Sequence, residues 1–94
     1  VRASERVYDY ISGTPMARLF LNIGRSQNVS PGDILGAVAG ESGIPGRVVG
    51  SIDMYDAYTF VEVPEEYAQI VLDAMKHARI RGKSVHAERA EARR

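Results

Sequence analysis

The segment 56–63, with the sequence DAYTFVEV, alternates between two kinds of side chain with a period of two. Successive side chains of a β-strand point to opposite faces, so this alternation predicts a strand. One face of the strand would be an ordinary core face made of Thr59, Val61 and Val63. The other face would present Tyr58, Phe60 and Glu62. A fold built around this strand leaves two neighbouring aromatic rings outside its core.

A second segment, 19–24 with the sequence LFLNIG, has the same alternation. Its inward-facing residues would be Leu19, Leu21 and Ile23. Its outward-facing residues would be Phe20 and Asn22, and Arg18, directly before the segment, would share their face. Because alternate residues of a strand share a face, neighbouring strands would join the rings of Phe20, Tyr58 and Phe60 into one aromatic surface.

The first of two predicted helices begins after Ser30. Ser30 is a favourable N-cap residue, Pro31 fits the first helical position, and Asp33 lies in the first turn. The buried stripe of this helix would be Ile34, Leu35 and Val38. The helix would end at Gly40 and Gly43, and Gly36 within it would allow a close helix–sheet contact.

The second predicted helix begins at Pro64, which is followed by the acidic residues Glu65 and Glu66. Acidic side chains in the first turn interact favourably with the helix dipole. The amphipathic stripe of this helix would consist of residues spaced by three and four: Tyr67, Ile70, Val71, Ala74 and Met75. This spacing is typical of a helix that covers one side of a core.

Two further strands complete the predicted fold. A strand over 49–55 would enter the 58–63 strand through a short hairpin, with Ile52 and Met54 facing inward. Its outward residues would be Ser51, Asp53 and Tyr55. A last strand over 84–89 would follow a turn at Gly82, with Val85 and Ala87 facing inward.

The predicted order of elements is β-α-β-β-α-β. This is the ferredoxin-like split βαβ arrangement of the α+β class, in which two helices cover one face of a four-stranded antiparallel sheet. We expect residues 16–90 to form this domain, residues 1–15 to be an N-terminal arm or linker, and residues 91–94 to start a basic tail. Because the chain starts at Val1, we expect a domain of a longer protein.

The aromatic positions fit two sequence patterns of RNA-binding sheets. Segment 58–63 matches the last six positions of the RNP1 pattern, and 19–24 fits its companion RNP2. In such RRM-like sheets the aromatic rings stack on unpaired bases. Asp56 and Ala57 occupy the two positions that are normally a basic residue and glycine. Ordinary packing residues remain an alternative interpretation of the rings.

Charge is unevenly distributed along the chain. The formal net charge is zero, but residues 76–94 hold seven basic and two acidic residues, and residues 1–75 hold five basic and ten acidic ones. A basic end of net charge +5 can bind phosphate, although a solvated helix end and tail explains it equally. We expect the last strand to bring its basic residues along the Phe20 side of the aromatic surface.

The sequence contains no constellation typical of catalysis, metal binding or cofactor binding. His77 and His86 fall on different predicted elements, whereas zinc sites need four ligands at defined spacings. The serines and glycines form neither a nucleophile elbow nor a phosphate-binding loop. Cysteine is absent, which excludes disulfides and favours a reducing cytoplasmic setting. No apolar run approaches the ~18 residues needed to cross a membrane.

Five groups of short segments carry a family resemblance across residues 16–90. They are RLFLNIGR at 18–25, SPGDILGA at 30–37, GI at 43–44 with GSI at 50–52, FVEVP at 60–64, and RGK at 81–83 leading into VHA at 85–87. Through them the chain resembles the RNA-binding domain appended to bacterial DEAD-box RNA helicases of the DbpA/CsdA type. The PGDILGA segment is the most specific, since a generic RNA-recognition fold does not need it.

This resemblance implies a non-catalytic domain of an ATP-dependent RNA helicase that acts in ribosome biogenesis. The domain would dock structured RNA, including ribosomal RNA, while the helicase core in the same parent chain unwinds nearby duplex. The ATPase motifs of that core are absent from this chain. Two features depart from the family pattern: Asp53 and Glu62 place carboxylates on the expected RNA face, and loop 25–29 carries Arg25 as its one basic residue.

Three groups of residues are therefore expected to bind RNA. Bases would stack on Phe20, Tyr58 and Phe60. Hydrogen bonds would come from Asn22 and His86. Phosphates would be met by Arg18, Arg25, Arg79, Arg81, Lys83 and Arg89. The alternative is a protein-interaction module, in which the same bare sheet face docks a protein helix or the domain's own arm.

Overall fold

The computed structural model describes residues 15–90 of the chain. Its principal elements are β1 (Met16–Leu21), α2 (Pro31–Ser42), β2 (Ile52–Met54), β3 (Thr59–Pro64), α3 (Glu65–Met75) and β6 (Ala87–Arg89). Short connecting elements are the 3₁₀ helices η1 (Arg25–Gln27) and η2 (Gly46–Val48) and the strands β4 (Arg79–Ile80) and β5 (Lys83–Ser84). The predicted arm and tail lie outside the described residues, apart from Pro15.

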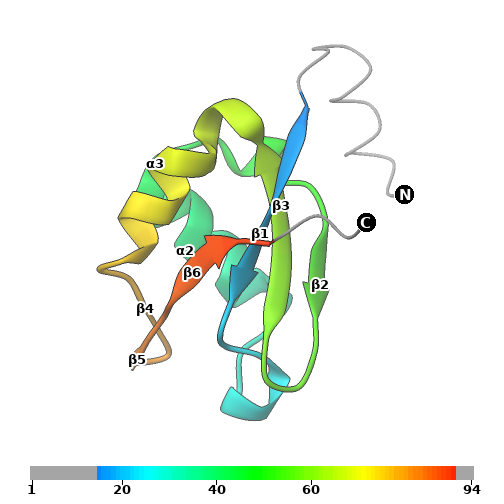
Figure 1. Ribbon diagram of the computed structural model, residues 1–94. Coiled ribbons are helices and arrows are strands. Elements are labelled where there is room, and N and C mark those ends of the chain that lie inside the picture. The colour runs from blue at the N-terminus through cyan, green and yellow to red at the C-terminus, as the bar shows by residue number, and fades with distance from the viewer. Residues whose placement is uncertain (1–14, 91–94) are drawn as a thin grey trace.

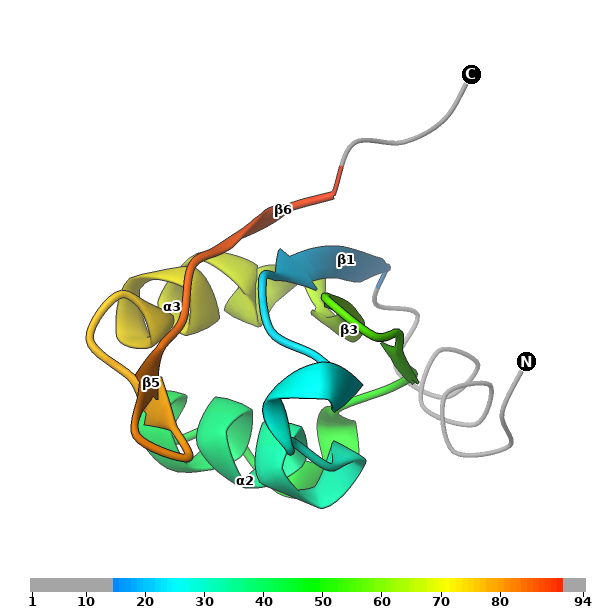
Figure 2. The ribbon, with the colours of Figure 1, turned by 90° about the horizontal axis from the view of Figure 1, so that it is seen from below.

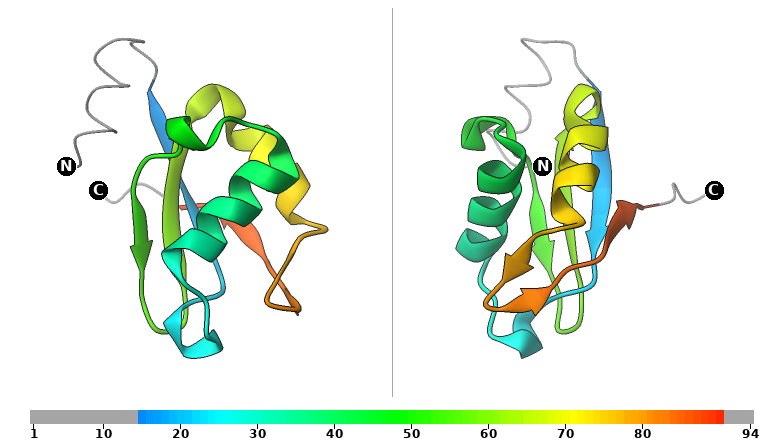
Figure 3. Two further views of the ribbon diagram at one scale, coloured as in Figure 1. Left: turned by 180° about the vertical axis from the view of Figure 1, so that it is seen from behind. Right: turned by 90° about the vertical axis from the view of Figure 1, so that its left-hand side faces the viewer.

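The main sheet has the strand order β2-β3-β1-β6, and all of its neighbouring strands are antiparallel. Figure 1 views the sheet from its open side, with α2 towards the back and α3 at the left of the strands. The reverse view in Figure 3 brings both helices in front of the strands. The predicted α+β fold of the β-α-β-β-α-β type is therefore confirmed, with the first and third predicted strands adjacent at the centre.

The core lies between the sheet and the helices. Leu19 and Leu21 of β1 and Val61 and Val63 of β3 are fully buried, as their alternation predicts. Thr59 is also fully buried, and its Oγ1 donates a hydrogen bond of 2.8 Å to the carbonyl oxygen of Ile23. This bond satisfies a hydroxyl that would otherwise be buried without a partner.

The buried stripes of both helices differ from the predicted ones. Leu35 of α2 is 37% exposed and Ile70 of α3 is 50% exposed, so both predictions of burial are wrong. The buried residues of α3 are Val71 and Met75, as predicted, together with Ala68, which the predicted stripe did not include. Consecutive helical residues are about 100° apart, so a helix that presents Val71 to the sheet turns Ile70 away from it.

Two predictions about the glycines of α2 are also wrong. Gly40 lies inside the helix, which ends at Ser42. Gly43 caps the helix in a left-handed conformation (φ 83°), so the prediction for this second glycine is confirmed. The N–H of Gly43 donates a hydrogen bond to the carbonyl of Ala39, as a glycine C-cap does. A Cβ at Gly36 would meet nothing within 4 Å, so this glycine does not mediate a close helix–sheet contact.

The predicted strand 49–55 is regular only over Ile52–Met54. The N–H of Gly50 donates to the carbonyl of Glu62, and the N–H of Glu62 donates to the carbonyl of Ser51. Two residues therefore oppose one, as in a β-bulge, and the alternation shifts there. Ser51, which was expected to face outward, is only 2% exposed.

The predicted last strand, 84–89, is split into two parts. β5 pairs with β4 in a separate two-stranded hairpin, and only β6 pairs with β1. The hairpin turn consists of Arg81 (φ 55°) and Gly82 (φ 79°), and positive φ at both central residues is the requirement of a type I′ turn. In Figure 2 the hairpin lies at the edge of the helix layer, away from β2.

Among the described residues, no helix combines the length and the apolar character that crossing a membrane requires.

Candidate nucleic-acid interface

Four aromatic rings form a continuous cluster on the open face of the sheet. Phe20 and Phe60 are opposite each other in the β1–β3 pairing, with ring centroids 5.9 Å apart. Tyr58 lies 5.9 Å from Phe20 and 5.6 Å from Phe60. The structure therefore brings together the three rings that the sequence singled out. We call these rings and Tyr55, described next, the aromatic platform.

Tyr55 joins the platform although the sequence analysis did not include it among the binding residues. Its ring centroid lies 5.1 Å from that of Tyr58 and 6.3 Å from that of Phe60. Its side chain is 46% exposed, compared with 39% for Tyr58. The predicted outward position of Tyr55 in the strand 49–55 indicated that its ring would lie on the open face. Its contact with Tyr58 depends on the hairpin between the two residues, which the sequence pattern did not describe.

The loop after β1 supports the Tyr55 end of the platform. The N–H groups of Arg25 and Ser26 donate hydrogen bonds of 2.8 Å to the carbonyls of Tyr55 and Asp56. A Cβ at Gly24 would lie 2.7 Å from the carbonyl oxygen of Asp56, so only glycine fits this approach. Arg25 is exposed on this loop, and its backbone position is thereby coupled to the platform.

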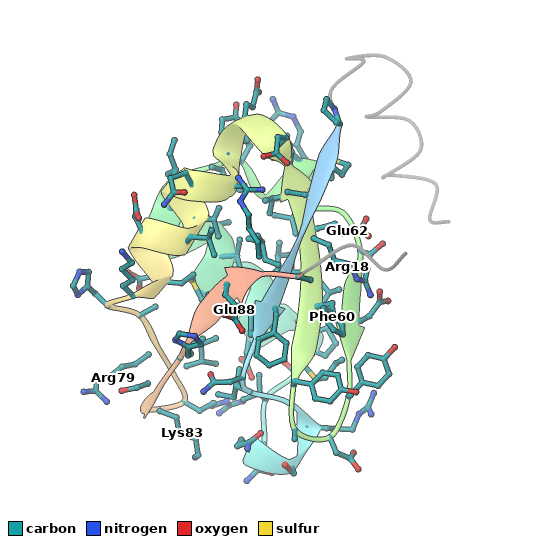
Figure 4. The ribbon with its side chains drawn as sticks, viewed as in Figure 1. Arg18, Phe60, Glu62, Arg79, Lys83 and Glu88 are labelled. Carbon is teal, nitrogen blue, oxygen red and sulfur yellow. The ribbon has the colours of Figure 1, made fainter. Side chains whose placement is uncertain are left out.

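Arg18 lies on the open face, but two carboxylates hold its guanidinium. Nη1 is 2.8 Å from Glu62 Oε2, and Nη2 is 2.9 Å from Asp53 Oδ2. The guanidinium carbon lies over the ring of Phe60, 4.6 Å from its centroid. Figure 4 shows Arg18 and Glu62 together beside Phe60. The predicted phosphate contact of Arg18 therefore competes with two ion pairs.

Asn22 and His86 meet at the start of β6. Asn22 Oδ1 accepts a hydrogen bond of 2.7 Å from the N–H of His86, and the N–H of Asn22 donates to the carbonyl of His86. The Asn22 side chain therefore positions the strand that follows His86. His86 Nε2 lies 3.8 Å from Glu88 Oε1, and Glu88 is opposite Phe20 in the β1–β6 pairing. This corner of the open face thus combines an imidazole and a carboxylate.

Arg89 lies on the other face of the sheet, contrary to the expected basic rim beside Phe20. Its pairing partner is Leu19, whose side chain points into the core. Its Nη2 is 2.8 Å from Glu65 Oε2 at the start of α3. Adjacent residues of β6 point to opposite faces of the sheet, so Glu88 and not Arg89 lies beside Phe20.

The remaining predicted basic residues lie on the β4–β5 hairpin. Arg81 Nε is 3.1 Å from Asp33 Oδ2, which ties the hairpin to the start of α2. Within residues 15–90, no carboxylate lies within 4.0 Å of the cationic groups of Arg79 or Lys83. In Figure 4 both side chains lie on the hairpin, on the opposite side of β1 from Phe60.

Asp33 belongs to the N-terminal cap of α2 and also forms the ion pair with Arg81 of the β4–β5 hairpin. Its Oδ2 accepts a hydrogen bond of 3.0 Å from the N–H of Ser30. This hydrogen bond, and then the guanidinium of Arg81, lower the pKa of the Asp33 carboxyl from its ordinary value. The carboxylate is therefore the favoured form at neutral pH.

The open face of the sheet and the β4–β5 hairpin carry charges of different sign. The open face carries Asp53, Glu62 and Glu88 around the platform, with Arg18 among them. The hairpin carries Arg79, Arg81 and Lys83. This geometry suits stacking of planar groups on one surface and attraction of anions to the other.

In the described part of the chain, no group of three or more histidine, aspartate and glutamate side chains is arranged to hold a metal ion.

Comparisons with known proteins identify the family to which the chain belongs. The model of the family described as the DbpA RNA binding domain matches residues 18–89. The ATP-dependent RNA helicase DeaD of Haemophilus influenzae is 33% identical over 76 residues, which are 81% of this chain and 12% of that protein. The ATP-dependent RNA helicase DbpA of Escherichia coli is 32% identical over 69 residues, which are 73% of this chain and 15% of that protein. The chain thus spans a small part of the length of these relatives.

A solved structure supports the fold. The structure of the Nab3 RRM, which concerns recognition of cis elements in non-polyadenylated RNAs, matches with a TM-score of 0.66 and 17% sequence identity. The match covers 82% of this chain and 97% of that one. The two chains therefore share the RRM fold.

Proposed function

Because the chain belongs to the DbpA RNA binding domain family, we propose that it is a non-catalytic module that binds RNA by stacking unpaired bases on its aromatic platform. The observation that carries this proposal is the contact between Phe20, Tyr58 and Phe60 on the face of the sheet opposite α2 and α3. Base–aromatic stacking contributes ~1–3 kcal/mol per base, so three rings supply enough affinity for a short RNA strand.

The hairpin would add affinity that does not depend on RNA sequence. Arg79 and Lys83 are exposed, and phosphate contacts of this kind release counterions and orient the nucleic acid. The stacked bases and the contacted phosphates would then lie on different parts of the molecule. An RNA that bends, such as a loop next to a duplex, can reach both.

The parent of this domain is proposed to be a cytoplasmic ATP-dependent RNA helicase, since the relatives carry that name and are much longer. In such a protein the domain would dock structured RNA, with ribosomal RNA as one candidate. The helicase core would then unwind duplex near the docking site, in ribosome biogenesis. None of these steps requires a catalytic group in the chain itself.

An NMR titration with single-stranded and hairpin RNA tests the proposal. We expect the largest chemical-shift changes at Phe20, Tyr55, Tyr58 and Phe60. Smaller changes are expected at Arg79 and Lys83. Changes confined to the exposed face of α3, around Ile70, would contradict the proposed surface.

The protein-interaction alternative uses the same face. It is favoured by one observation, the carboxylates of Asp53, Glu62 and Glu88 around the platform, because acidic groups repel phosphates. An absence of RNA binding at low salt by a folded chain would favour this alternative, since surface electrostatic attraction is strongest there.

A further inference from the structure

Arg18 is fixed on three sides on the open face. Its two terminal nitrogens are ion-paired to Asp53 and Glu62 at 2.9 and 2.8 Å, from the two strands β2 and β3. Its guanidinium lies over the ring of Phe60. Because both carboxylates bind the edge of the guanidinium, they hold it in position above the Phe60 ring.

The charge of Arg18 is poorly placed to bind a phosphate. A phosphate that approached its terminal nitrogens would meet the carboxylates of Asp53 and Glu62, and like charges repel. The donors that point to these carboxylates are already used. The flat face of the guanidinium is different, because stacking needs neither a free donor nor an uncompensated charge.

We propose that Arg18 is a stacking surface for an RNA base, which extends the aromatic platform beyond Phe60, and that Asp53 and Glu62 are the residues that position it. Arginine guanidinium planes are known surfaces for stacking of unpaired bases. The Arg18 side chain is 38% exposed, so a ligand on the open face can reach it. This inference rests on the proposed function, since it assumes that bases bind on the platform.

Two substitutions distinguish a stacking role from a phosphate contact. Arg18→Lys keeps the charge but removes the planar group, and Arg18→Gln removes the charge. We expect both variants to bind a single-stranded RNA oligonucleotide about fivefold or more weakly than the wild type, which is the weaker end of base stacking. The slope of log K against log salt should stay at the wild-type value in both.

Either of two results would overturn the inference. A phosphate contact predicts near-normal binding by Arg18→Lys, together with a slope flattened by roughly 0.7 in Arg18→Gln. Tighter binding by Arg18→Gln would mean that Arg18 covers Phe60 and competes with RNA.

The positioning role of the carboxylates has its own test. Glu62→Gln should weaken RNA binding in the wild-type background but have little further effect in the Arg18→Gln background, as coupling through one group requires. Equal losses in both backgrounds would show that Glu62 acts independently of Arg18. A general loss of stability would weaken RNA binding in both backgrounds. Thermal unfolding of each variant measures that loss.

An NMR measurement on the wild type does not depend on whether the variants fold. We expect the side-chain Nε–H signal of Arg18 to shift upfield when RNA binds, because a stacked base shields it. An unchanged signal, while Tyr58 signals shift, would overturn this inference and leave the proposed function intact. If no signal on the platform changes at low salt, both fail.

Discussion

The aromatic platform and the β4–β5 hairpin differ in how their charges are used. On the open face beside the platform, Arg18 is ion-paired to Asp53 and Glu62. On the hairpin, Arg79 and Lys83 have no carboxylate within ion-pair distance among residues 15–90. The first region therefore offers planar surfaces with little attraction for anions, and the second offers positive charge without aromatic rings.

Under the proposed function, this difference explains how a chain of zero net charge can bind RNA. Recognition of bases and attraction of phosphates depend on different forces, and the proposed function assigns them to these two separate regions. The two contributions can therefore be removed one at a time.

The largest expected effect comes from removing a platform ring. Phe60→Ala should weaken RNA binding by about 1–3 kcal/mol, because it removes a stacking surface and the ring beneath Arg18. Fluorescence anisotropy with labelled single-stranded RNA measures this loss, and the salt dependence should stay unchanged. Ile70→Ala, which truncates an exposed apolar side chain on α3, is the control and should bind normally. Normal binding by folded Phe60→Ala would remove the platform from the RNA surface.

A comparable effect on stability is expected where the loop supports the platform. Gly24→Ala would place a methyl group within 2.7 Å of the Asp56 carbonyl oxygen and the Tyr58 backbone nitrogen, so the hairpin must shift. Overpacking of this kind costs about 1–3 kcal/mol of unfolding free energy. Urea denaturation measures it.

Gly36→Ala is the matched control, because its Cβ would meet nothing within 4 Å inside α2. Alanine in place of glycine in an exposed helix should stabilise the protein by about 0.5–1 kcal/mol. If Gly24→Ala were as stable as the wild type, the loop would not hold the Tyr55 end of the platform.

A smaller effect is expected from the hairpin. The double variant Arg79→Gln, Lys83→Gln should bind all RNAs roughly tenfold more weakly, and its slope of log K against log salt should fall by roughly 1.4, about 0.7 for each lost phosphate contact. The control Arg79→Lys, Lys83→Arg keeps both charges and should retain the slope. A wild-type slope in the double Gln variant would refute the separation of the two regions.

The smallest effect concerns the contact between the hairpin and α2. The pKa of Asp33 is lowered in the folded state, first by the Ser30 N–H and then by Arg81, so its carboxylate stabilises the fold above the unfolded-state pKa. That stabilisation is lost as the pH falls through the lower, folded-state pKa. We therefore expect Asp33→Ala to be less stable than the wild type at pH ~7, and the difference to shrink towards pH ~3. A difference that did not change over this range would assign the effect to something other than ionisation.

Much of the fold could be predicted from local patterns. The alternation in 58–63 correctly assigned Thr59, Val61 and Val63 to the core. Ser30 caps α2 as expected, with its Oγ accepting from the N–H of Asp33. These features depend on residues that are near each other in the sequence, where strand period and capping geometry are strong constraints.

Local patterns were less informative about faces and short elements. Helical spacing alone could not place the sheet-facing side of α3, where Ala68 is buried and Ile70 is not. The bulge at Gly50–Ser51 shortened one predicted strand, and the break between β5 and β6 divided another. Where a bulge or a break in a strand falls depends on its pairing partners, which are remote in the sequence, so local alternation could not locate either one.

The sequence by itself determined that an aromatic face would exist, because a period of two fixes which residues of a strand point together. Only the tertiary structure decided what surrounds that face. Arg18 meets Asp53 and Glu62, which are 35 and 44 residues away, through the pairing of three strands. Arg89 turns to Glu65 because its register opposes Leu19. Electrostatic partners depend on distances of a few ångströms between remote segments, and no local pattern contains those distances.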